Sequence, residues 1–88
     1  MRFRNTGFNL LIKDLIMKEC LALEPCKFLT ENGFSVMYDI NRSRVDNIFY
    51  DLEKDGFFKH NNIDITYYER KYRNRLHRYK VYVKRGDV

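Results

Sequence analysis

The chain has 88 residues, of which 44% are hydrophobic, including seven Phe and seven Tyr. This length predicts one small domain, and the apolar content excludes a disordered chain. Neither a signal peptide nor an apolar run of membrane-spanning length is visible, so we expect a soluble protein without a membrane partner. The expected location is the cytoplasm, or the host cytoplasm if the source is viral.

The formal net charge of +5 is concentrated in the second half of the chain. Residues 1–40 hold five Lys or Arg and five Asp or Glu, whereas residues 66–86 hold eight cations against the single acid Glu69. Such a basic segment predicts an anionic partner. Nucleic acid is the first candidate, and an acidic protein or a membrane surface comes after it.

The N-terminal part begins with a short basic segment, in which Arg2 and Arg4 flank Phe3. Residues 1–6 are either a frayed end or a basic arm that contacts a phosphate or a minor groove. The following stretch, Phe8–Leu23, has apolar residues over more than a third of a helical circumference. Either this helix is central and covered on both sides, or part of it forms a homodimer surface.

Pro25 ends the first helix and predicts a short second helix over 25–32, because Pro is tolerated in a first turn but not in a helix interior. We expect this helix to end at Gly33 and to bury Cys26, Phe28 and Leu29. The next segment, Phe34–Asn41, is open between a short strand and a helical turn that Ser35 caps.

No catalytic or metal-binding group of residues is evident. Cys20 and Cys26 are the only cysteines, and zinc requires about four ligands, so we expect two reduced, mostly buried thiols and no metal. His60 and His77 lack a neighbouring nucleophile, base and orienting group, and no glycine-rich loop is present. We therefore expect no enzyme activity, no cofactor and no small-molecule ligand.

The strongest helical pattern lies in the stretch from Asn41 to His60. Its apolar residues follow the i, i+3, i+4, i+7 spacing of one helical stripe, at Val45, Ile48, Phe49 and Leu52. Asn41 or Ser43 is expected to cap the first turn. Gly56 is expected to end the helix in the left-handed conformation, with Phe57 and Phe58 returning to the core.

Two segments after this helix, Ile63–Tyr72 and Leu76–Lys84, alternate as β-strands. A three-residue loop at 73–75 sets Ile65 opposite Val83 and Tyr67 opposite Val81, which gathers apolar residues on one face. A two-residue loop would instead set Ile65 beside Tyr82 and Tyr67 beside Lys80, which mixes the faces. We therefore predict the three-residue loop. The outer face would then carry Thr66, Tyr68, Arg70, Arg78, Lys80 and Tyr82.

The run Leu52-Glu53-Lys54-Asp55-Gly56-Phe57-Phe58-Lys59, followed directly by a basic hairpin, resembles the recognition helix and wing of winged helix-turn-helix domains. The resemblance covers roughly the second half of the chain. It implies an α+β fold with about three helices followed by a C-terminal two-stranded β-hairpin wing, in one domain over residues 1–88. It also raises the expectation of a homodimer through the Phe8–Leu23 helix.

The resemblance further implies sequence-specific binding of double-stranded DNA by a small transcriptional regulator, whose brevity points to a phage, viral or plasmid origin. The recognition helix, about 42–55, would enter the major groove, and the wing, 63–84, would contact the backbone or minor groove. Within the helix the candidate DNA-binding residues are Arg42, Ser43, Arg44, Asn47 and Tyr50. Within the hairpin they are Arg70, Lys71, Arg73, Asn74, Arg75, Arg78 and Lys80.

This hypothesis requires Arg42, Arg44 and Asn47 to share an outward surface with the basic hairpin. The competing interpretation of the two arginines is ion pairing with Asp46 or Asp51 along the helix.

Two other functions stay open. A winged-helix protein-interaction module would bind an acidic partner, an interpretation that the acidic residues of the central helix favour. An RNA-binding protein would stack bases on exposed strand tyrosines such as Tyr68 and Tyr82.

Overall fold

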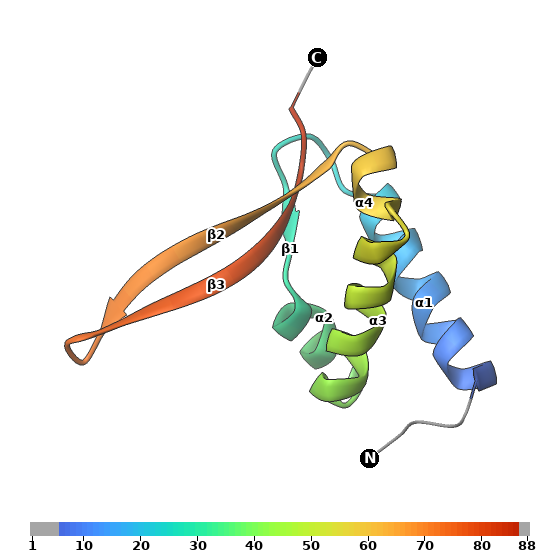
Figure 1. Cartoon of the computed structure of the whole chain (residues 1–88), viewed down its shortest axis with the longest axis horizontal. Coiled ribbons are helices and arrows are strands. Elements are labelled where there is room, and N and C mark those ends of the chain that lie inside the picture. Colours follow the sequence, from blue (N-terminus) through green and yellow to red (C-terminus); the bar gives the residue numbers. More distant parts are fainter. Residues whose placement is uncertain (1–5, 87–88) are drawn as a thin grey trace.

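The computed structural model describes residues 6–86, which form an α+β domain of four helices and a three-stranded antiparallel sheet (Figure 1). The sheet has the strand order β1-β3-β2, and the long β2–β3 hairpin projects away from the group of helices. The elements in chain order are α1 (Thr6–Leu21), β1 (Phe28–Leu29), α2 (Glu31–Tyr38), α3 (Arg42–Lys54), α4 (Phe57–His60), β2 (Ile63–Tyr72) and β3 (Arg75–Lys84).

The first helix is not covered on both sides. α1 buries Ile12, Ile16 and Cys20, which follow one another at intervals of four residues and face the core. Its outer side leaves Leu10 and Leu21 exposed by 60% and 54% within the part of the chain that the structure describes. Of the two alternatives for this helix, the central one covered on both sides is therefore wrong. The basic arm expected over residues 1–6 lies outside the described residues, apart from Thr6 in the first turn of α1.

The helix expected over 25–32 is absent, and the third strand begins there instead. The Cys26 amide donates to the Lys84 carbonyl at 3.0 Å, and the Lys84 amide donates to the Lys27 carbonyl at 2.9 Å. These partners lie almost 60 residues away, so no local pattern reveals them. Only Leu29 of the three residues expected to be buried is buried, because Phe28 points to the opposite face of the strand and Cys26 is exposed.

The segment Phe34–Asn41, for which a strand and a helical turn were both open, is helical in its first part. Its residues up to Tyr38 belong to α2, which begins earlier, at Glu31. Thr30 caps α2 by accepting a hydrogen bond from the Gly33 amide at 2.9 Å. Gly33 therefore lies in the first turn of α2 and does not end a helix. The helix ends at Asp39, which adopts the left-handed conformation at φ 53°. A turn of residues 39–41 then leads into α3.

The structure confirms the central helix and both of its ends. Asn41 caps α3 by accepting hydrogen bonds from the amides of Ser43 and Arg44, at 2.9 and 3.3 Å. Gly56 follows the helix with φ 82°, a conformation that costs little only for glycine. The stripe of Val45, Ile48, Phe49 and Leu52 is buried.

The hairpin has the two-residue loop and the register that were rejected because they mix apolar and polar residues on each face. A two-residue turn, Arg73-Asn74, joins the strands, with both residues at positive φ (51° and 62°), as a type I′ turn requires. Ile65 lies opposite Tyr82, and Tyr67 lies opposite Lys80.

The prediction, which assumed that one face of the hairpin is buried along its whole length, failed because only the base of the hairpin packs on the helices. Over the projecting part, neither face is buried, so the turn and not burial sets the register. A shift of one residue exchanges the two faces of β3 relative to β2. The residues Lys80, Arg78 and Tyr82 thus lie on the face that continues toward the helices, and not on the outer face as predicted.

An aromatic cluster holds the sheet against the helices. Tyr82 of β3 is fully buried, and its ring centroid lies 4.8 Å from that of Phe49 and 4.7 Å from that of Phe58. Phe34 of α2 extends the cluster at 6.1 Å from Phe49. One ring from β3 therefore contacts rings from both α3 and α4, and aromatic side chains dominate the energetics of such cores.

Shortening Tyr82 tests this arrangement. Tyr82→Ala should lower the free energy of unfolding by about 3–5 kcal/mol, because it leaves a ring-sized cavity. Tyr82→Phe keeps the ring and loses only the hydroxyl's hydrogen bond to a carboxylate, a loss of about 1.5–3 kcal/mol. Urea unfolding measures both, with the exposed Tyr68→Phe as a control that should change stability by less than about 0.5 kcal/mol. Equal losses for the two Tyr82 variants would contradict a central position of the ring.

Candidate nucleic-acid interface

The outward face of α3 carries a polar strip of four exposed residues. They are spaced at i, i+4, i+7 and i+11, so they lie in line along the helix opposite the buried stripe. The strip consists of Ser43, Asn47, Tyr50 and Lys54. The Lys54 ammonium lies 5.4 Å from the centroid of the Tyr50 ring, which the ring's electron-rich face favours. Lys54 was not among the residues predicted to bind DNA, although its spacing from Ser43 could have identified it.

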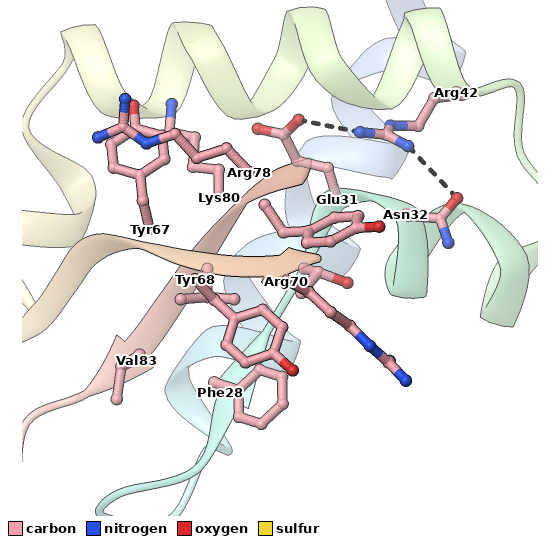
Figure 2. A pocket seen from close by; sticks show the side chains of 13 residues that line it. Phe28, Glu31, Asn32, Arg42, Tyr67, Tyr68, Arg70, Arg78, Lys80 and Val83 are labelled. Atoms are coloured by element: carbon pink, nitrogen blue, oxygen red, sulfur yellow. Dashed lines mark hydrogen bonds and ion pairs between the residues drawn. The ribbon is translucent and has the colours of Figure 1, made fainter. Parts of the chain in front are cut away.

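Arg42 lies beside the strip, on the flank of α3 that faces α2. Its Nε donates to Asp46 Oδ1 at 2.7 Å, and its two terminal nitrogens reach Asn32 and Glu31 (Figure 2). The hydrogen bond to Asp46 is the main cause of the raised pKa of Arg42. The ion-pairing interpretation is therefore correct for this residue, and its guanidinium links the first turns of α2 and α3.

Arg44 lies on the other flank of α3, toward α1. Its guanidinium carbon is 4.8 Å from the centroid of the Phe8 ring, a cation–π distance, and the side chain is half-buried. Arg42 and Arg44 thus point to opposite sides of the helix. The expectation that both share an outward surface with Asn47 is wrong, because residues two apart in a helix do not face the same direction.

Most of the acidic side chains of α3 and its C-cap are paired within the domain. Asp46 holds Arg42, Glu53 accepts from Lys80 Nζ at 2.8 Å, and Asp55 lies 3.6 Å from Lys13 Nζ. Asp46 and Glu53 face α2 and the hairpin, whereas Asp55 faces α1. These three carboxylates therefore lie on the two flanks of the polar strip of α3, and the strip itself contains no acid. Asp51, the fourth acid of this segment, is exposed at the edge of the strip.

The hairpin cations divide into two groups. Lys80 pairs with Glu53, and Arg78 lies 3.9 Å from Glu69 and 4.4 Å from the centroid of the Tyr67 ring. The second group, here named the tip cations, surrounds the turn, and none of its members forms an ion pair within residues 6–86. The tip cations are Arg70, Lys71, Arg73 and Arg75. Asn74 lies among them in the turn.

A partly buried carboxylate supports the junction between α2, α3 and β3. The Tyr82 hydroxyl donates to Glu31 Oε2, and Glu31 also lies 3.7 Å from Arg42. Burial raises the pKa of Glu31, and the hydrogen bond from Tyr82 opposes that rise. Burial and the adjacent Glu31 raise the pKa of the Tyr82 hydroxyl, so it stays a donor. This junction fixes how the hairpin leaves the helices.

Among the described residues we find neither a reactive thiol at Cys20, nor a metal site, nor a membrane-spanning helix. Burial raises the pKa of the Cys20 thiol to about 12, which keeps it protonated and unreactive. Within residues 6–86, no group of three or more His, Cys, Asp or Glu side chains is arranged to hold a metal ion. In the same range, the longest apolar helical stretch falls short of what crossing a membrane requires.

Comparisons with protein-family models, with curated proteins and with solved structures found no match to this chain.

The raised pKa of Glu31 predicts a pH dependence with a defined sign. A carboxyl whose folded-state pKa exceeds its ordinary value of 4.5 favours the folded state fully below that pH. This contribution is lost as pH rises through the folded pKa. The free energy of unfolding of the wild type relative to Glu31→Gln should therefore fall over that window and then level off. Urea titrations of both proteins across the window measure this difference, and a difference that rises with pH would contradict the assignment.

Proposed function

We propose that the chain is a winged helix-turn-helix domain that binds double-stranded DNA as a small transcriptional regulator. The observation that carries the proposal is the combination of the acid-poor polar strip on α3 with four tip cations that have no carboxylate partner among residues 6–86. The strip would enter the major groove, and the tip cations would contact phosphates.

The arrangement of elements supports this proposal. α2 and α3 are joined by a turn of residues 39–41, the length that a helix-turn-helix unit uses. α3 buries one stripe and presents the opposite one, as a recognition helix must. The short β1 strand beside β3 adds a third strand to the two that were expected, and it anchors the hairpin at its base.

The chemistry of the exposed residues supports it as well. Asn47 offers both a donor and an acceptor, which matches the N6 and N7 edge of adenine. Ser43 and Tyr50 carry hydroxyls, and Lys54 carries a charge, so these three suit phosphate contacts. A ten-residue strand spans about 33 Å, close to the roughly 34 Å of one duplex turn. The hairpin can thus reach phosphates about one turn away from the groove that α3 occupies.

Arg42 and Arg44, which were both predicted to bind DNA, are assigned structural roles instead. Arg42 would have to give up its ion pairs with Asp46 and Glu31 to reach a base, so we assign it to positioning α3 against α2. Arg44 is directed toward α1, and we assign it to that helix contact. The pairing of Asp46, Glu53 and Asp55 within the domain also removes the main argument for an acidic-partner module, which was the unexplained acidic content of the central helix.

Salt dependence of duplex binding tests the role of the tip cations. Removal of one cation that neutralises a phosphate should reduce the slope of log K against log salt by about 0.9. Arg73→Gln with Arg75→Gln should therefore reduce it by about 1.8 and weaken all sequences alike. Arg85→Gln removes one charge at the hairpin base, where Arg85 pairs with Asp64, and should leave the slope unchanged. Equal slopes for the wild type and the double variant would overturn this assignment.

The exposed side of α1 supports a homodimer as part of the proposal. Leu10 and Leu21 lie in line along it, and both are more than half exposed. Two copies that pair through this side would present two α3 helices to one duplex. A dimer of that kind reads half-sites about 34 Å apart, so the target would be palindromic.

Sedimentation equilibrium of the full chain tests the dimer. We expect the wild type to associate with rising concentration, and Leu10→Glu with Leu21→Glu to remain monomeric, because two carboxylates would be buried at the interface. The matched control is Val36→Glu with Met37→Glu, which changes two apolar residues of α2 that are also more than half exposed and should leave association intact. A wild type that stays monomeric at every concentration would rule the dimer out.

A further inference from the structure

Four aromatic rings form a continuous row along the face of the hairpin opposite to that of Tyr82. Ring centroids are 6.1 Å apart for Tyr68 and Tyr79, 6.4 Å for Tyr79 and His77, and 6.1 Å for His77 and Tyr72. The three tyrosines are exposed by 47–58%, so their ring faces are accessible to a ligand. Tyr82, which was predicted to be an exposed stacking residue, is buried, and Tyr79 instead lies opposite Tyr68, where the predicted register placed Lys80.

The row continues into a hollow at the base of the hairpin (Figure 2). The hollow has a volume of about 1170 Å³, and Phe28 of β1, which is 61% exposed, lines it beside Tyr68. Thr30 and Asn32, at the start of α2, supply polar groups at its edge. The lining also includes the ion pair of Glu31 with Arg42, and the helix-facing residues Tyr67, Arg78 and Lys80. An exposed aromatic surface with a polar edge is a typical ligand-binding surface.

The charges on this face are positive. Arg70 lies opposite His77, and Arg75 lies opposite Tyr72, so both arginines share the face of the ring row. The guanidinium of Arg73 lies 5.5 Å from the centroid of the Tyr72 ring. The one acid on this face among the described strand residues is Asp64 at the base, where Arg85 neutralises it. The ligand that fits is therefore anionic and carries flat rings.

We propose that this face binds single-stranded nucleic acid, with unpaired bases stacked on the ring row and phosphates held by Arg70 and Arg75. Neighbours on one face of a strand are about 7 Å apart, roughly twice the 3.4 Å spacing of stacked bases in a duplex. The rings therefore suit bases that are unstacked from one another, and a duplex does not expose its base faces. The ring row is separate from the polar strip of α3, and only Arg70 and Arg75 are shared with the tip cations assigned to duplex phosphates. This inference therefore goes beyond duplex binding and does not depend on it.

Fluorescence anisotropy with the full chain tests the site, using oligo(U), oligo(dT) and a duplex of about 15 nucleotides, near the upper site size of stacking folds. Loss of one stacking ring weakens binding by about 5- to 150-fold. Tyr68→Leu with Tyr79→Leu should therefore weaken single-strand binding by at least about 10-fold and leave duplex affinity within a factor of about 3. The matched control is Tyr50→Leu, the same change at an exposed tyrosine of α3 that lines neither the ring row nor the hollow, which should preserve single-strand binding.

Ring-proton NMR spectra of the wild type give a second reading that needs no variant. Addition of the single strand should shift the ring signals of Tyr68 and Tyr79 upfield and leave those of Tyr50 in place, because stacked bases shield the protons they cover. The stronger of the two oligonucleotides identifies RNA or DNA as the source of the ligand. Failure of the wild type to bind either one would overturn the proposal, and so would an equal loss in Tyr50→Leu.

Discussion

The position of the Tyr82 ring between the helices and the hairpin is the constraint on which the rest of the structure depends. The ring packs against Phe49 and Phe58, and its hydroxyl donates to Glu31 at the start of α2. Burial of one tyrosine thus fixes β3 against three helices at once. Once β3 is fixed, the two-residue turn determines which residues of β2 lie opposite which residues of β3. Every surface of the hairpin follows from this position, including the side on which each cation and each tyrosine lies.

The distribution of charge follows from the same register. With Tyr82 inward, Lys80 also faces the helices and pairs with Glu53, which neutralises a carboxylate beside the polar strip of α3. The cations farther out have no helix to contact, and around the turn they remain without carboxylate partners among the described residues. Net charge alone does not distinguish these two groups. The basic segment is therefore part ion-pair support and part accessible surface, and only the second part is available for phosphates.

Sequence reasoning succeeded where the pattern was local and failed where it was long-range. The stripe of α3, its Asn41 cap and the left-handed Gly56 depend on neighbours within a few residues, and all three were predicted. The β1 strand depends on Lys84, so the pattern around Pro25 gave a helix instead. The hairpin register failed because the criterion of a buried face was applied to strands that project into solvent. The residues of the candidate strip on α3 were found in part, since Ser43, Asn47 and Tyr50 are exposed, whereas Arg42 and Arg44 are held by partners that only the fold brings near.

The most direct test of the account is amide chemical-shift mapping of the isotope-labelled chain during titration with duplex DNA. The central claim is that one duplex contacts the polar strip of α3 and the tip of the hairpin together. We predict that the amides of Ser43, Asn47 and Lys54 shift in parallel with those of residues 70–75, at one shared affinity, while the buried residues of α1 keep their positions. Shifts that are confined to the hairpin, with the α3 strip unchanged at saturation, would contradict that claim.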